Sequence, residues 1–262
     1  MGNHWLTTMV ACLQASAFGQ TGLTVAKLSL GTVKFGRKEG LKYPHPVSLP
    51  DDRAAQTLLD GARDLGITLL DTAPAYGSSE RRLGQLLKGQ HQHWQICTKV
   101  GEEFTAGQSH FDFTPEHCRY SIERSLRHLQ RDCIDIALIH SDGNDLDNLQ
   151  NYGTLDALKE LKSAGKIRAV GMSHKTLAGG QLALKQGVDV LMATLNTDYT
   201  LETDLISQAA DMGVGVLIKK ALNSGHANPK DLSWIAQHQG VSSLVVGTTN
   251  LTHLRANADL VG

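Results

Sequence analysis

Residues 114–140 read TPEHCRYSIERSLRHLQRDCIDIALIH, and this stretch indicates the fold class. The Thr-Pro-Glu that opens it is typical of a helix start, with a capping hydroxyl, a proline at the first helical position and an acid in the first turn. Apolar residues then recur at helical spacing and predict an amphipathic helix over 115–129. The apolar run Ile134–His140 that follows predicts a buried strand.

The same alternation of helix and strand extends in both directions along the chain. Helix-like segments are expected at 51–65, 115–129, 155–163, 177–185, 203–212 and 231–238. The short apolar runs expected as strands are Ala26–Gly31, Ile67–Asp71, Trp94–Val100, Ile134–His140, Ile167–Ser173, Val188–Asn196, Val214–Lys219 and Leu244–Gly247. Eight strands alternating with helices predict an α/β protein, a single-domain (β/α)8 TIM barrel.

A doubly wound parallel sheet is the competing architecture. It would need a glycine fingerprint after its first strand, whereas the only Gly-x-Gly, Gly213-Val-Gly215, precedes a strand. We therefore expect a barrel over residues 18–262, preceded by an N-terminal extension over residues 1–17. The extension lacks the positively charged start of a secretory signal.

Composition narrows the possible partners. Lys and Arg number 25 against 26 Asp and Glu, so no basic excess points to nucleic acid, and no apolar run is long enough to cross a membrane. The four cysteines form no Cys-x-x-Cys pair, which argues against a disulfide framework and a zinc site. We expect a cytoplasmic monomer or weak homo-oligomer that acts on a small molecule and holds no metal.

Polar side chains stand at the ends of three successive predicted strands. Asp71 ends one strand and Tyr76 follows in a loop braced by proline and glycine, Lys99 lies inside the next strand, and His140 ends the third. Each has an ordinary structural explanation alone, such as a turn-capping aspartate or a satisfied core histidine. Because active sites of barrels lie at the carboxyl ends of the strands, the set predicts a common catalytic site.

The side chains of these four residues indicate a type of reaction. A tyrosine is a poor acid because its ordinary pKa is about 10, and a neighbouring ammonium lowers that pKa. Lys99 would have this effect on Tyr76, Asp71 would pair with Lys99, and His140 would donate a hydrogen bond to a carbonyl oxygen. The set suits reduction of a carbonyl by hydride transfer, with Tyr76 as the general acid.

The segment Asp71-Thr-Ala-Pro-Ala-Tyr76-Gly-Ser-Ser-Glu80 resembles the signature of the aldo-keto reductases. Further matches follow in the family's order at Thr98–Val100, Leu138–His140, Gly171–Ser173 and Val246–Asn250, so the resemblance covers nearly the whole chain. It implies a barrel that binds NADPH, with NADH as the alternative, and reduces aldehydes or ketones to alcohols, with Tyr76, Lys99, Asp71 and His140 as the catalytic residues.

The resemblance also implies a set of cofactor-binding residues along the strand ends. These are Gly31, Thr32, Asp71, Ser173, His174, Met192, Lys219, Lys220, Gly247, Thr248, Thr249, His253 and Asn257. The chain departs from the family where it has His174 for an asparagine, Met192 for a glutamine and Lys219 for an aromatic residue. These departures leave open the preference between NADPH and NADH. They also leave an alternative function, a nicotinamide-nucleotide-binding regulatory or sensor protein with little turnover.

Overall fold

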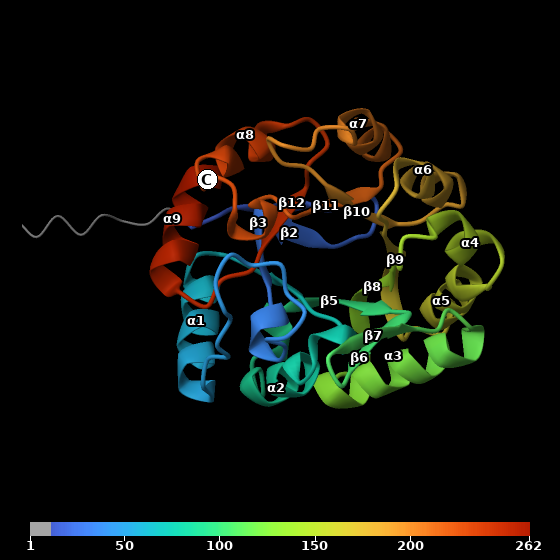
Figure 1. Ribbon diagram of the computed structural model, residues 1–262, viewed down its shortest axis with the longest axis horizontal. Helices are drawn as coiled ribbons and strands as arrows, with labels where there is room; N and C mark the ends of the chain where they lie inside the picture. Colours follow the sequence, from blue (N-terminus) through green and yellow to red (C-terminus); the bar gives the residue numbers. More distant parts are fainter. Residues whose placement is uncertain (1–11) are drawn as a thin grey trace, which may run out of the picture.

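Eight parallel strands close into a barrel in the computed structural model, which describes residues 12–262 (Figure 1). Each strand pairs with the next one in the chain, and the last pairs with the first through Leu244 and Leu28. The predicted (β/α)8 fold is confirmed. The barrel strands are β3 (Leu28–Gly31), β4 (Leu69–Asp71), β5 (Gln95–Val100), β8 (Ile134–His140), β9 (Ile167–Ser173), β10 (Val190–Thr194), β11 (Gly215–Lys219) and β12 (Ser243–Val246).

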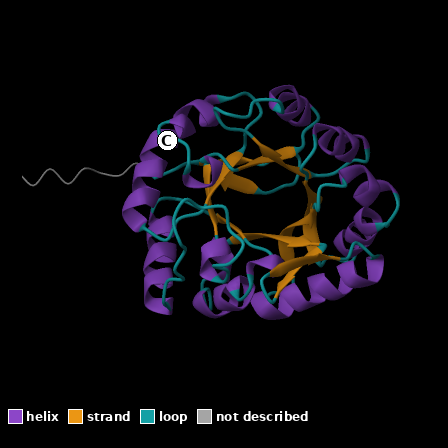
Figure 2. Cartoon of the chain, viewed as in Figure 1, coloured by secondary structure: helices purple, strands orange, loops and turns teal. Residues whose placement is uncertain are grey.

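Helices surround the ring of strands and bury their apolar faces against it (Figure 2). The predicted helix over 115–129 has those bounds, and its Thr114 cap accepts a hydrogen bond from the backbone N–H of His117. Sequence periodicity missed α2 and α4, whose residues are mostly polar. The helices are α1 (Asp52–Asp64), α2 (Ser79–Leu86), α3 (Pro115–Leu129), α4 (Asp145–Gln150), α5 (Thr154–Ser163), α6 (Leu177–Lys185), α7 (Thr203–Asp211), α8 (Asp231–Gln237) and α9 (Leu251–Val261). None of the helices within residues 12–262 is long and apolar enough to cross a membrane.

A hairpin of β1 (Ala15–Ala17) and β2 (Thr24–Ala26) precedes the barrel and was not predicted. Its connecting residue Phe18 is fully buried and packs with Leu69 and Leu217 inside the barrel. The boundary expected between an extension at 1–17 and the barrel therefore falls inside this hairpin. Residues 1–11 of that extension lie outside the described residues.

The interior of the barrel explains how polar side chains reach one place. Successive residues of a strand point to opposite faces, so every second residue points inward. Leu69, Cys97 and Leu138 belong to the inner apolar cluster. Two residues further along each strand lie Asp71, Lys99 and His140, at the carboxyl end where the apolar filling stops.

A second unpredicted hairpin lies at this carboxyl end. It consists of β6 (Glu102–Thr105) and β7 (Gln108–Phe111), which pair in antiparallel fashion directly after β5. Gly101 joins β5 to the hairpin with φ of +102°, a conformation that disfavours side-chain-bearing residues. Figure 1 shows the hairpin on the same side of the ring as α3.

Candidate active site

Lys99 is the centre of the predicted site. Its Nζ donates hydrogen bonds to Oδ1 of Asp71 at 2.6 Å and to the carbonyl oxygen of Thr72 at 2.8 Å, and lies 3.3 Å from the hydroxyl of Tyr76. The side chain is 1% exposed, so the ammonium is compensated by Asp71 rather than by water. The structure thus brings together Asp71, Tyr76 and Lys99 from two neighbouring strands and the turn after β4.

Tyr76 is fixed by a tightly packed turn, η2 (Pro74–Tyr76). Pro74 opens the turn, and Gly77 ends it with φ of +62°. A Cβ on Gly36 would lie 2.3 Å from the carbonyl oxygen of Tyr76, so only glycine allows the two backbones this approach. Arg37 donates a hydrogen bond to the carbonyl oxygen of Ala75 and holds the turn from the same side.

The pKa of Tyr76 is raised above its ordinary value. Burial is the largest cause, and the nearby ammonium of Lys99 acts in the opposite direction without overcoming it. The net shift is the reverse of the one expected from Lys99 alone. At neutral pH the site therefore holds a protonated phenol beside a charged Lys99, whose pKa is raised because Asp71 and Tyr76 outweigh the effect of burial.

His140 lies against Tyr76 and against a carboxylate that sequence analysis did not identify. The two rings meet edge to face, with centroids 6.3 Å apart. Nδ1 of His140 lies 2.9 Å from Oε2 of Glu102, the first residue of β6. Glu102 also accepts a hydrogen bond from the hydroxyl of Ser109 and lies 3.7 Å from NH1 of Arg37. The sequence signal that could have identified Glu102 is its position three residues after Lys99, just beyond the end of that strand.

The groups around His140 shift its pKa in opposite directions. Burial is the largest cause that lowers the pKa of His140, and Lys99 and Lys219 add to it, while Glu102 acts to raise it. The pKa of Glu102 is lowered to about 2, because its interactions with His140, Ser109 and Arg37 outweigh burial. Near neutral pH the pair therefore consists of an ionised carboxylate and an imidazole with one proton.

A second buried polar cluster lies at the ends of β9, β10 and β11. His174 is fully buried, and its Nε2 lies 2.8 Å from Oε2 of Glu202, which also accepts from the N–H of Thr194. Lys219 donates hydrogen bonds to Oγ of Ser173, at 3.0 Å, and to the carbonyl oxygen of His174. Burial lowers the pKa of Lys219 to about 7. His174 is thus turned toward Glu202, and the structure leaves it no exposed surface for a ligand.

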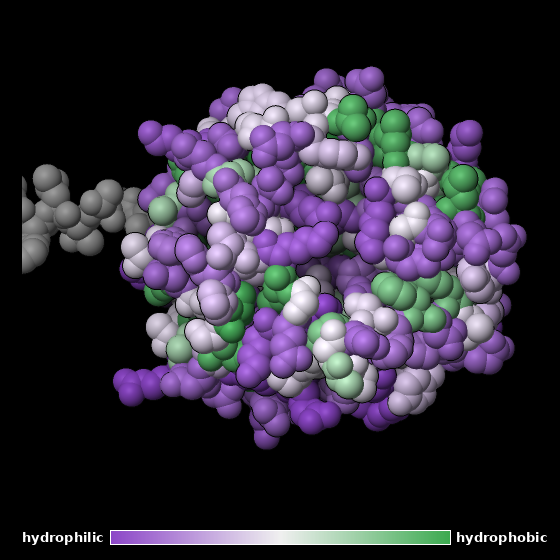
Figure 3. All heavy atoms as spheres, in the orientation of Figure 1, coloured by the Kyte–Doolittle hydropathy of each residue, from purple (hydrophilic) through white to green (hydrophobic). Residues whose placement is uncertain are grey.

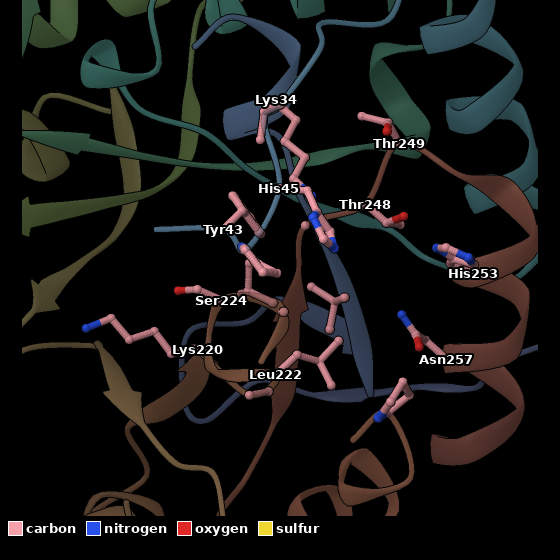
Figure 4. Close-up of a pocket in the computed structure, with 18 of the residues that line it drawn as sticks. Lys34, Tyr43, His45, Lys220, Leu222, Ser224, Thr248, Thr249, His253 and Asn257 are labelled. Carbon is pink, nitrogen blue, oxygen red and sulfur yellow. The ribbon is translucent and has the colours of Figure 1, made fainter. Parts of the chain in front are cut away.

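A cavity of about 600 Å³ lies beside β12 and α9 (Figure 4). Six of the predicted cofactor residues line it, namely Lys220, Gly247, Thr248, Thr249, His253 and Asn257. The other predicted cofactor residues do not line it. Gly31, Asp71, Ser173 and Lys219 lie at strand ends, and Met192 lies in the middle of β10 within the inner apolar cluster. His174 belongs to the second polar cluster, and Thr32 is fully buried with its hydroxyl bonded to the carbonyl oxygen of Asp71.

The segment between β3 and α1 forms the opposite wall of this cavity and was missed by sequence analysis. Lys34, Tyr43 and His45 all line it, and Nζ of Lys34 lies 3.8 Å from the centroid of the Tyr43 ring. Figure 4 shows His45 between Lys34 and Thr248. A Cβ on Gly247 would lie 3.0 Å from the Tyr43 hydroxyl, so the segment packs closely over β12.

The cavity has an electrostatic character that suits an anion. No carboxylate lines it, while Lys34 and Lys220 do. Neither lysine has an acidic partner within 4 Å among residues 12–262, and burial lowers the pKa of both. The space-filling view shows a mostly hydrophilic face that is hollowed near the barrel axis (Figure 3). In this described part of the chain no three His, Cys, Asp or Glu side chains gather to hold a metal ion.

Comparison with known proteins agrees with the fold. The model of the aldo/keto reductase family matches residues 27–231. The chain belongs to the aldo-keto reductase family. This family consists of nicotinamide-dependent oxidoreductases, and the residues at the carboxyl ends of β4, β5 and β8 in this aldo-keto reductase lie within the matched segment.

Named relatives show how this aldo-keto reductase compares with others. It is 33% identical over 226 residues to L-galactose dehydrogenase from Arabidopsis thaliana. This match covers 81% of this chain and 66% of the plant protein. It is 29% identical over 226 residues to the NADH-specific methylglyoxal reductase of Escherichia coli, covering 79% of this chain and 67% of that protein. The matched segment thus spans about two thirds of either relative.

A solved structure of an aldo-keto reductase from Pseudomonas aeruginosa is more similar still. It shares 48% identity with this chain, with a TM-score of 0.87, and the match covers 94% of each chain. The two chains therefore share the same fold.

Proposed function

We propose that this aldo-keto reductase is an NADPH-dependent carbonyl reductase that converts aldehydes or ketones to alcohols. The observation that carries the proposal is the position of the Tyr76 hydroxyl, 3.3 Å from a buried ammonium that is itself paired with Asp71. A protonated phenol held in this way is a proton donor whose position is set before a substrate arrives.

Each residue then has a role in the reduction. Tyr76 gives its proton to the carbonyl oxygen, and Lys99 stabilises the phenolate that this leaves. Asp71 holds Lys99 in place, and His140, edge-on to the Tyr76 ring, orients the carbonyl oxygen. The nicotinamide, when bound, supplies the hydride that reaches the carbonyl carbon.

NADPH is proposed as the cofactor because of the cations that line the cavity. Lys34 is a partly buried cation and Lys220 an exposed one, and neither has an acidic partner in the described chain, so a phosphate would provide that partner. NADPH carries one phosphate more than NADH, so it gains more from such a site. We propose that the reductase acts in the cytoplasm as a monomer or weak homo-oligomer.

One observation favours a second candidate, a nucleotide-binding regulatory protein with little turnover. Oγ of Ser173, one of the predicted cofactor-binding residues, already accepts a hydrogen bond from Nζ of Lys219 at 3.0 Å. If this contact persisted, the nicotinamide end would be held less firmly than the end in the cavity.

The experiment that tests the proposal is a fluorescence titration of the purified protein with NADPH and with NADH, followed by addition of 4-nitrobenzaldehyde. Tight binding of NADPH with oxidation of the nucleotide is expected. Tyr76→Phe should bind NADPH as the natural protein does and lose about 10²–10⁴-fold in kcat. Binding without turnover would support the regulatory candidate, and wild-type turnover by Tyr76→Phe would refute the role of Tyr76 as the acid.

A further inference from the structure

The β6–β7 hairpin turns one of its faces toward the open carboxyl end of the barrel. Residues directly opposite each other in an antiparallel pair carry their side chains on the same face, and Glu102 is opposite Phe111. Glu102 is directed toward the predicted site, since its Oε2 lies 2.9 Å from Nδ1 of His140. The next residue, Glu103, belongs to the other face, where it pairs with Arg124 of α3. The ladder therefore places Phe111 on the same side of the hairpin as His140.

Phe111 belongs to an aromatic cluster at this end of the barrel. Its ring stacks on that of Phe113, with centroids 6.1 Å apart, and Tyr152 meets the Phe113 ring with centroids 5.8 Å apart. Phe113 lies against the turn after β5, because a Cβ on Gly101 would lie 2.4 Å from its ring. Phe113 is 5% exposed, whereas Phe111 is 40% exposed. A buried ring thus supports one that keeps much of its surface open.

An open ring beside a proposed catalytic group suits a planar aromatic molecule. Two aromatic rings attract each other when their centroids are about 4.5–7 Å apart, and burial of their apolar surface adds to the attraction. Phe104 lies on the same face of the hairpin, but the guanidinium carbon of Arg37 lies 3.4 Å from the centroid of its ring and covers it. Figure 3 shows apolar surface next to the hollow near the barrel axis. Phe111 therefore remains open for a substrate.

A cation lies next to the same ring. Nζ of Lys175 is 5.8 Å from the centroid of Phe111. The backbone N–H of Lys175 donates to Oδ2 of the buried Asp145, so the base of this side chain has a fixed place. Between residues 12 and 262, no carboxylate lies within 4 Å of its ammonium group. An anionic group on a ring bound at Phe111 would supply the missing partner.

We propose that Phe111 is a specificity-determining residue on which the ring of an aromatic aldehyde stacks, and that Lys175 favours a ring carrying a carboxylate. This substrate class rests on the proposed carbonyl reduction and makes it more specific. The aldehyde group is directed to Tyr76 and His140, and the carboxylate on the far side of the ring is directed to Lys175. The hairpin that brings Glu102 to His140 thus also selects the substrate.

The role of Phe111 is tested by kcat/KM, with saturating NADPH, for 4-carboxybenzaldehyde, benzaldehyde and butanal. The natural protein should prefer them in this order. Phe111→Leu keeps an apolar side chain without the ring and should lower kcat/KM for benzaldehyde relative to butanal by about tenfold. Tyr120→Leu, which removes an exposed ring from α3, is the control and should keep the natural ratio. An unchanged ratio in Phe111→Leu would refute the role of Phe111.

The role of Lys175 has a readout of its own. Lys175→Gln should lower the preference for 4-carboxybenzaldehyde over benzaldehyde by about threefold, and high salt should reduce this preference in the natural protein but not in the variant. Lys185→Gln removes an exposed lysine at the end of α6 and should keep the natural preference. The same preference in Lys175→Gln as in the natural protein would refute the role of Lys175.

Binding without turnover separates this proposal from the proposed reduction. Calorimetry with 4-(hydroxymethyl)benzoate, the alcohol that reduction of 4-carboxybenzaldehyde would give, should show a dissociation constant about tenfold higher for Phe111→Leu than for the natural protein. Such binding in a protein that reduces no aldehyde would refute the proposed function and leave the recognition by Phe111 intact. Reduction of all three aldehydes with the same kcat/KM in the natural protein and in Phe111→Leu would refute the recognition by Phe111 and leave the reduction intact.

Discussion

Lys99 and Asp71 form an ion pair with an N–O distance of 2.6 Å, and neither side chain is more than 5% exposed. The pair lies where the apolar filling of the barrel ends, with Cys97 one inward position below Lys99. Such a pair costs much to desolvate, so it contributes little net stability while both partners are present. Its value lies in the fixed position that it gives to the ammonium beside Tyr76.

Removal of one partner should therefore destabilise the protein more than removal of both. Lys99→Met leaves the Asp71 carboxylate buried without compensation and should lower the free energy of unfolding by about 3–5 kcal/mol, whereas Asp71→Leu with Lys99→Met should lower it less. Urea denaturation measures both. Lys162→Met, which opens a more exposed pair with Asp189, is the control and should cost less than about 1 kcal/mol. A double variant less stable than Lys99→Met would contradict this account.

Lys34 and Lys220 should decide the preference for NADPH over NADH. Replacement of either by Ala removes a cation from the wall of the cavity and should weaken NADPH binding by about 10-fold or more, with a smaller effect on NADH. The dissociation constants of both nucleotides, measured by fluorescence at two salt concentrations, give the comparison. Lys185→Ala removes an exposed lysine at the end of α6 and should change neither constant. Equal weakening of NADPH and NADH would show that these lysines do not distinguish the two.

Lys219 should make stability depend on pH. Its pKa is about 7 in the folded protein, against 10.5 as the ordinary value, so between these pH values the unfolded chain binds more protons. The contribution of Lys219 to the free energy of unfolding therefore rises with pH across this window.

The variant Lys219→Met lacks this contribution. Its stability relative to the natural protein should be greatest near pH 7 and should decrease toward pH 9, as measured by urea denaturation at both pH values. Lys185→Met changes the same formal charge at an exposed position and should show no such trend. A constant difference between Lys219→Met and the natural protein would mean that Lys219 keeps its ordinary pKa.

Gly84 should resist replacement although it lies inside a helix. Propensity alone predicts that Ala would stabilise α2 by up to about 1 kcal/mol. A Cβ on Gly84 would lie 2.0 Å from the carbonyl oxygen of His128, so α2 could no longer pack against α3. Gly84→Ala should instead lower the melting temperature, with a cost of about 1–3 kcal/mol. Gln85→Ala, at the exposed neighbouring position, should stay within about 0.5 kcal/mol, and a stabilised Gly84→Ala would disprove the close contact.

Much of the fold followed from local pattern. The strand bounds Ile134–His140 and Ile167–Ser173 were predicted to the residue, because long apolar runs between helices with clear caps leave little choice of structure. The two hairpins were not predicted. Glu102–Phe111 is polar and exposed along much of its length, and it depends on Gly101 and on packing against the barrel rather than on its own periodicity.

The sequence by itself determined the barrel and the positions of Asp71, Tyr76, Lys99 and His140, because period-two alternation along a strand is local and barrel closure brings strand ends together. Only the tertiary structure decided what these residues meet. Glu102 reaches His140 from a hairpin, Lys34 and Tyr43 reach the cavity from the segment after β3, and His174 turns to Glu202. The direction of the Tyr76 pKa shift also needed the structure, because burial and the charge of Lys99 oppose each other and only their sum in three dimensions shows that burial prevails.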